Sequence, residues 1–109
     1  MATSYKVLGQ VNPAANTLTT LYTVPFGANT VCSTLCVCNQ TANSVSFSIA
    51  VRPGGAAIQT KLYIAFNTPV PSNDTLHLTI GLSLATTDVV SVNASSSAVS
   101  FNLFGSEIM

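Results

Sequence analysis

Hydrophobic and polar residues alternate along most of the chain, and this pattern predicts β-strands. In residues 44–51, SVSFSIAV, apolar side chains alternate with serine and alanine. The segments 75–82 (TLHLTIGL) and 99–103 (VSFNL) repeat the pattern. A period of two places successive side chains on opposite faces of a strand, so each segment is expected to be half buried.

Loops rich in Asn, Pro and Gly separate the predicted strands. Examples are Asn12-Pro13, Pro25-Phe26-Gly27, Pro53-Gly54-Gly55 and the segments 39–43 and 67–73. Such residues favour turns, Asn because its side chain bonds its own backbone. Many short strands at this spacing predict an all-β fold, a single antiparallel β-sandwich or jelly-roll-like domain of about seven or eight strands. The strands are expected at residues 5–10, 17–24, 29–38, 44–52, 59–66, 75–82, 88–93 and 98–104.

The N-terminal residues 1–16 are expected to form an extended segment beside the sandwich domain, which we place at residues 17–109. The segment has a strand-like start and then reaches Pro13-Ala14-Ala15. It is interpreted as an edge strand or as an arm that lies along a neighbouring subunit.

The composition indicates a protein that associates with other copies or proteins. Charged residues make up 6% of the 109 residues, against about 25% in typical soluble domains. The three basic and three acidic residues balance to a net charge of zero. Since a net charge near zero weakens repulsion between molecules, we expect the surface to be covered by copies of the chain or by another protein.

The charge pattern also argues against several partners. Nucleic-acid binding needs a basic patch, and three scattered cations do not form one. An anionic membrane surface would likewise require clustered Lys or Arg. The first 16 residues lack the apolar run of a secretory signal, so synthesis in a reducing cytosol is expected.

Three cysteines lie within VCSTLCVC, residues 31–38. They are the residues of this sequence that most suggest a metal, redox or disulfide site. Regular alternation would place Cys32, Cys36 and Cys38 on one face of a strand, together with Thr34. Neighbours on that face are roughly 6.6–7 Å apart, at the limit for a disulfide. A zinc site would need a fourth ligand and a turning loop between the cysteines. We therefore predict no metal and interpret the cysteines as small buried hydrophobic residues.

The other face of this strand is also apolar, with Val31, Leu35 and Val37. An antiparallel strand with one wet side does not need two apolar faces. One face is expected to pack in the core, and the other is expected to be covered by a flanking segment or another subunit.

No catalytic constellation is recognisable, so we expect a non-enzymatic protein without a cofactor. The single histidine, His77, has no evident nucleophile or orienting acid. Neither a nucleophile elbow nor a phosphate-binding glycine pattern is present. Asp74 and Asp88 are interpreted as residues that end loops and begin strands, and a pair of glycosidase carboxylates is disfavoured because the chain has three acids in all.

Sugar binding is a weaker alternative. Lectin-like sites combine aromatic platforms with polar groups, and the chain has no tryptophan. Phe47, Phe66 and Phe101 are expected in the core. Tyr5, Tyr22 and Tyr63 remain as candidate platforms.

Four stretches resemble small structural proteins of tailed bacteriophages, including cyanophages. They are residues 2–10 (ATSYKVLGQ), 21–25 (LYTVP), 84–92 (LATTDVVSV) and 100–107 (SFNLFGSE). The resemblance implies a β-sandwich made in the bacterial cytoplasm and carried in the virion. It implies a capsid decoration (cement) protein or, as alternatives, a neck, tail or fibre component with a receptor- or glycan-binding role.

Such a protein would contact copies of itself and other virion proteins, including the major capsid protein. Apolar residues without an evident core role are the candidates for these contacts. They lie in the N-terminal segment, in the cysteine strand and near the C-terminus: Tyr5, Val7, Leu8, Cys32, Cys36, Cys38, Phe104 and Ile108.

Overall fold

A computed structural model describes residues 3–109, apart from the side chain of Ile80. Two short 3₁₀ turns, η1 (Pro53–Gly55) and η2 (Thr60–Leu62), lie between the fourth and fifth strands. Among the described residues, no helix has the length and apolar character needed to cross a membrane. The strands are β1 (Thr3–Val11), β2 (Thr19–Thr23), β3 (Asn29–Asn39), β4 (Val45–Arg52), β5 (Tyr63–Val70), β6 (Thr75–Leu84), β7 (Val89–Ala94) and β8 (Val99–Ile108).

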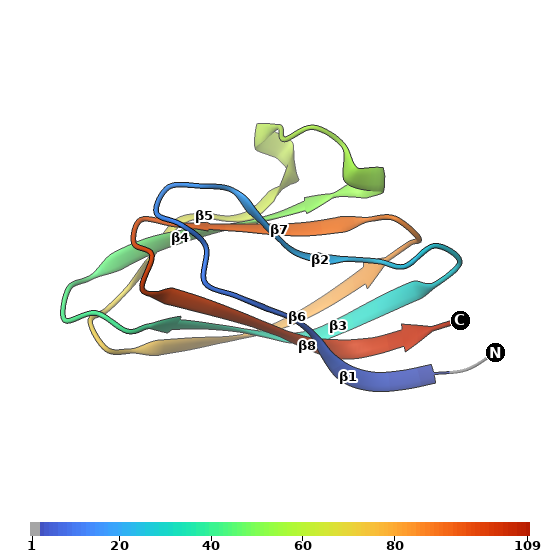
Figure 1. The fold of residues 1–109 in the computed structure, drawn as a ribbon, viewed down its shortest axis with the longest axis horizontal. Coiled ribbons are helices and arrows are strands. Elements are labelled where there is room, and N and C mark those ends of the chain that lie inside the picture. The colour runs from blue at the N-terminus through green and yellow to red at the C-terminus, as the bar shows by residue number, and fades with distance from the viewer. Residues whose placement is uncertain (1–2) are drawn as a thin grey trace.

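The strands form two antiparallel four-stranded sheets that pack face to face (Figure 1). The first sheet has the order β1-β8-β3-β6, and the second has the order β2-β7-β4-β5. Most connections pass from one sheet to the other; within residues 3–109, only β4 and β5 are consecutive strands of the same sheet. Eight strands wound in this order make a jelly roll. The predicted all-β sandwich is therefore confirmed.

The core lies between the sheets and consists of the inward side chains of both. The rings of Phe47 on β4 and Phe101 on β8 meet edge to face, with centroids 6.1 Å apart. Leu35, Ile49 and Leu103 are fully buried around them. The alternating segments 44–51 and 99–103 supply much of this core, as half-buried strands are expected to do.

A β-bulge at Ser33 interrupts the alternation of β3. Against β8, Cys32 pairs with Gly105 and Thr34 pairs with Phe104, so Ser33 is an extra residue without a partner. A Cβ atom on Gly105 would lie 2.2 Å from the carbonyl oxygen of Val31. The close approach of the two backbones at the bulge therefore requires glycine at this position of β8.

The bulge shows that the predicted single face for Cys32, Thr34, Cys36 and Cys38 is wrong. Cys32 is fully buried in the core, whereas Cys36 and Cys38 are half buried on the outside of the first sheet. Leu35 and Val37, which the alternation placed opposite the cysteines, point into the core beyond the bulge and are fully buried.

The β5 region departs most from the predicted strands. A strand was expected at residues 59–66, but the 3₁₀ turn η2 occupies Thr60–Leu62 and β5 continues to Val70. As an edge strand, β5 accommodates Pro69 and the positive φ of 48° at Asn67. Phe66, expected in the core, is 63% exposed and contacts the ring of Tyr63 edge to face.

Residues 3–11 form the edge strand β1 of the first sheet. β1 pairs antiparallel with β8 along its length, from Thr3 opposite Ile108 to Val11 opposite Phe101. A register shift at Leu8 marks a second irregularity, close to the bulge of β3. The start of β1 and the end of β8 thus lie together at one end of the sandwich (Figure 1).

Replacing the two phenylalanines separately tests the assignment of inner and outer positions. We expect Phe101→Ala to lower the free energy of unfolding by about 3–5 kcal/mol, because it leaves a cavity in the centre of the core. The matched control Phe66→Ala removes a largely exposed ring and should cost less than about 1 kcal/mol. Urea denaturation of both variants measures the difference. Equal losses would contradict the assignment.

Candidate interaction surface

Six of the eight candidate contact residues lie on one surface, the outer face of the first sheet. The register places Tyr5 and Val7 of β1 beside Ser106 and Phe104 of β8, with their side chains facing outward. The other members of the six are Cys36, Cys38 and Ile108. Leu8 and Cys32 do not belong to this surface, because Leu8 packs against the core and Cys32 is part of it.

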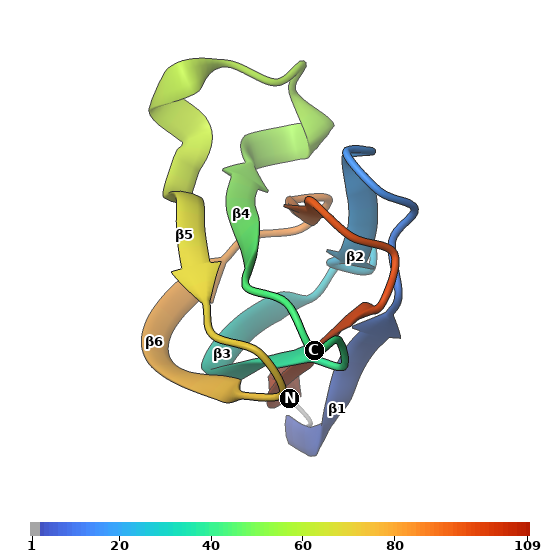
Figure 2. The same cartoon turned by 90° about the vertical axis from the view of Figure 1, so that its left-hand side faces the viewer.

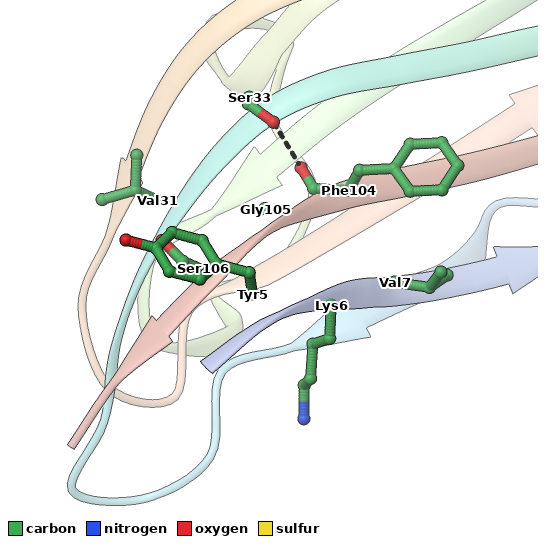
Figure 3. A pocket seen from close by; sticks show the side chains of 8 residues that line it. All are labelled: Tyr5, Lys6, Val7, Val31, Ser33, Phe104, Gly105 and Ser106. Atoms are coloured by element: carbon green, nitrogen blue, oxygen red, sulfur yellow. Dashed lines mark hydrogen bonds between the residues drawn. The ribbon is translucent and has the colours of Figure 1, made fainter. Parts of the chain in front are cut away.

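An open groove of about 620 Å³ lies on this face, along β1, β8 and β3 (Figure 3). Tyr5 and Val31 lie at one end of it, and Val7 and Phe104 at the other. We call the eight lining residues the outer groove: Tyr5, Lys6, Val7, Val31, Ser33, Phe104, Gly105 and Ser106.

The outer groove exposes large apolar side chains. Tyr5 is 85% exposed, Val7 48% and Val31 42%. Val31 was not among the candidates, because its contribution depends on the bulge and on the pairing with β8. The bulged residue Ser33 donates a hydrogen bond to the carbonyl oxygen of Phe104, which fixes the floor of the groove.

Lys6 lines the groove with its stem but directs its charge away from it (Figure 3). Its Nζ lies 2.7 Å from Oε1 of Glu107, and the Glu107 side chain is buried between the sheets. The other carboxylate oxygen accepts a hydrogen bond from the hydroxyl of Tyr22, which is 2.8 Å from Oγ1 of Thr30. These contacts join β1, β2, β3 and β8 at the end of the sandwich.

This network shifts the acidity of its members. The hydrogen bond from Lys6, then that from Tyr22, lowers the pKa of Glu107 below its ordinary value of 4.5. Burial, followed by the hydrogen bond to Glu107, raises the pKa of Tyr22. Burial also raises the pKa of the nearby Cys32 thiol to about 11, so this thiol stays protonated at neutral pH. Tyr22, a candidate sugar platform, is thereby excluded from that role because it is buried.

The other half of the outer face is polar and contains the remaining two thiols. Cys36 pairs across β3 and β6 with His77, and Sγ of Cys36 lies 3.2 Å from Nδ1 of His77. Cys38 pairs in the same way with Thr75. On the opposite side of Cys36, Asn102 accepts a hydrogen bond from Nε2 of Gln10.

The remaining acids have structural partners. Oδ1 of Asp88 accepts the backbone N–H of Gly54, and its Oδ2 accepts that of Ala85. Asp74 accepts the N–H of Thr75, at the start of β6. Over the described residues, no three His, Cys, Asp or Glu side chains are grouped so that they could hold a metal ion.

β5 and β6 are edge strands of the two sheets and lie on the same side of the sandwich (Figure 2). A second apolar cavity, of about 440 Å³, lies between the sheets at these edges. The buried side chains of Phe47 and Ile49 reach it from the core, and Ile64 and Leu82 lie on either side. This cavity is not predicted by the sequence pattern, which places the strand at residues 59–66 instead of Tyr63–Val70.

Comparison with known proteins finds a structural neighbour of low sequence identity. No protein-family model matches the chain, and no curated protein matches it. Among solved structures, the fold is similar to part of a chain in the structure of infectious bursal disease virus Gt strain, with a TM-score of 0.48 and 12% sequence identity. The alignment covers 96% of this chain and 31% of that chain, so this chain spans less than a third of its neighbour.

Acidification should weaken the buried network in a way that depends on Glu107. A lowered pKa means that the folded state binds this proton less readily than the unfolded state. The stabilisation is therefore present above about pH 4.5, the ordinary value, and is lost as the pH falls through the folded pKa. We expect Glu107→Gln to cost roughly 1–3 kcal/mol at neutral pH, as hydrogen bonds to a charged group weaken.

Urea denaturation over a series of pH values measures this effect. The difference in unfolding free energy between wild type and Glu107→Gln should shrink as the pH is lowered. Asp74→Asn, which removes an exposed carboxylate, is the matched control and should change stability little at any pH. A difference between wild type and Glu107→Gln that stays constant down to about pH 2 would contradict the assigned role.

Proposed function

We propose that the chain is a non-enzymatic structural protein of a virus particle, and specifically a capsid decoration protein of a tailed bacteriophage. The observation that carries the proposal is the outer groove, an apolar surface made by the exposed Tyr5, Val7 and Val31 together with the half-buried Phe104. The jelly roll is an architecture used by viral capsid domains, and also by lectins and cupins. The resemblance of the sequence to phage structural proteins favours the first of these.

The charge distribution supports assembly through this face. The charge of Lys6 is directed to the buried Glu107, and the described outward side chains of the first sheet include no Asp, Glu, Lys or Arg. Burying such a surface costs little desolvation of charge, while apolar area contributes about 25 cal/mol per Å². The partner is a neighbouring copy or the major capsid protein.

The groove is only part of the contact that this function needs. A stable protein interface buries roughly 800 Å² on each partner. The contact must therefore extend beyond Tyr5 and Phe104 along the sheet, towards Ile108 on one side and Cys36 and Cys38 on the other. The six sequence-predicted residues on this face fall within that extended surface.

A neck, tail or fibre component that binds a receptor glycan is the second candidate. Its support is the Tyr5 ring, 85% exposed, with the side chains of Ser33 and Ser106 in the same groove (Figure 3). An aromatic platform beside hydroxyl groups is suited to sugar rings. Tyr63 is less suitable, since it is half buried against Phe66.

The copy number of the chain in purified phage particles tests the placement. Quantitative mass spectrometry should find an amount comparable to that of the major capsid protein if the chain decorates the shell. A handful of copies per particle would move it to the neck, tail or fibres, and Tyr5-dependent binding on a glycan array would then support receptor recognition. Absence from the particle would overturn both candidates.

Variants of the groove test the surface itself. Tyr5→Ser/Val7→Ser should weaken attachment to particles at least about tenfold, because a buried apolar side chain contributes roughly 1.5–3 kcal/mol. Phe26→Ser is the matched control: Phe26 is 90% exposed in the loop between β2 and β3, away from the groove. Rebinding of purified chain to particles that lack it gives the occupancies. Equal binding by the double variant and the wild type would remove the groove from the interface.

A further inference from the structure

The cysteine strand carries three thiols in three different surroundings. Cys32 is buried in the core. Cys36 and Cys38 are both half buried on the outer face, two residues apart on the same strand. They differ in their partners on β6, because Cys36 faces His77 and Cys38 faces Thr75. The chain thus contains a thiol–imidazole pair and, beside it, a thiol of similar exposure without an imidazole opposite.

We propose that Cys36 is a site of reversible S-thiolation by low-molecular-weight disulfides such as oxidised glutathione, with His77 as the proton acceptor. The thiolate is the form of cysteine that attacks disulfides. With its own proton on Nε2, the exposed imidazole of His77 can accept the thiol proton through Nδ1, across the 3.2 Å that separates the two atoms.

The exchange balances without a further reactant. The Cys36 proton passes to Nδ1 of His77, and the thiolate attacks one sulfur of the disulfide. A bond forms between Sγ of Cys36 and that sulfur, and the original S–S bond breaks. The departing glutathione thiolate takes the proton from His77. The Cys36 sulfur is oxidised and the released glutathione is reduced.

The geometry also favours persistence of the mixed disulfide. Cys38 is the nearest thiol on the same face, but alternate residues of a strand lie roughly 6.6–7 Å apart, at the upper limit for a disulfide. Cys32 lies on the other face of the sheet, inside the core. Neither cysteine is placed to displace the attached glutathione.

The modification would change the character of the outer face. Cys36 lies two residues from Thr34, and Thr34 pairs across β3 and β8 with Phe104, which lines the outer groove. A charged tripeptide at this position would stand on the surface that we propose for assembly. This consequence rests on the proposed function, whereas the exchange reaction itself does not.

The test compares the three cysteines within one full-length molecule. The reduced chain is mixed with oxidised glutathione, quenched with acid at intervals, and the adducts are located by fragmentation mass spectrometry. We expect Cys36 to react at least about tenfold faster than Cys38. This factor is smaller than the acceleration that enclosed general bases provide, because the Cys36–His77 pair is exposed. Cys32 should remain unmodified while the chain is folded.

Two variants assign the effect to the imidazole. His77→Gln should remove the preference for Cys36, and Thr75→His should accelerate the reaction of Cys38 by placing an imidazole opposite it. Equal rates at Cys36 and Cys38 in the wild type would overturn the proposal, as would an unchanged Cys36 rate in His77→Gln. The rates are measured on the chain alone, so they are independent of whether it occupies a particle.

Discussion

The β-bulge at Ser33 is the constraint on which the rest of the first sheet depends. β3 is a central strand, paired with β8 on one side and β6 on the other, and the register shifts against both at this point. Because side chains alternate along a strand, one extra residue exchanges the inner and outer faces beyond it. Cys32 before the bulge and Leu35 after it can therefore both reach the core.

The irregularity continues across the sheet. β1 shifts its register at Leu8, opposite the same part of β8 that faces the bulge of β3. Phe104 lies between the two shifts, paired with Val7 on one side and Thr34 on the other. Bulges increase the local twist of a sheet, and the outer groove lies along this line. The apolar surface is thus a result of the same backbone features that complete the core.

The few charged residues of the chain mainly hold its own structure together. Lys6 and Glu107 join the chain ends, Arg52 donates to the carbonyl oxygens of Gly55 and Ala56, and Asp88 accepts two backbone N–H groups. Among the described residues, no Asp, Glu, Lys or Arg side chain faces outward from the first sheet. The outer face of the first sheet is therefore even less charged than the chain as a whole. This lack of charge is the physical basis for expecting assembly through that face.

The sequence predicts the elements of this fold better than their faces and pairings. Alternation is a local signal, so the core positions of Phe47 and Phe101 could be inferred from it. The bulge between Cys32 and Cys36 cannot be predicted from the sequence, because a bulged strand and a regular strand with two apolar faces have the same pattern of apolar residues. The exposure of Phe66 cannot be predicted either, because an edge strand has the apolar pattern of a buried strand although some of its apolar side chains are exposed.

Sites formed across strands depend on register, which is set by contacts distant in sequence. The sequence shows no core role for Tyr5, Val7 and Phe104, and the pairing of β1 with β8 brings them into one groove. His77 is an isolated strand residue in the sequence pattern. It lies opposite Cys36 because the bulge turns that thiol outward and the shifted register of β3 and β6 pairs the two residues. Without the extra residue at Ser33, the alternation set by Cys32 would place Cys36 inside and Leu35 outside. The core, the apolar groove and the thiol–imidazole pair thus all depend on register shifts that lie side by side in the first sheet, at Ser33 of β3, at Leu8 of β1 and in the facing part of β6.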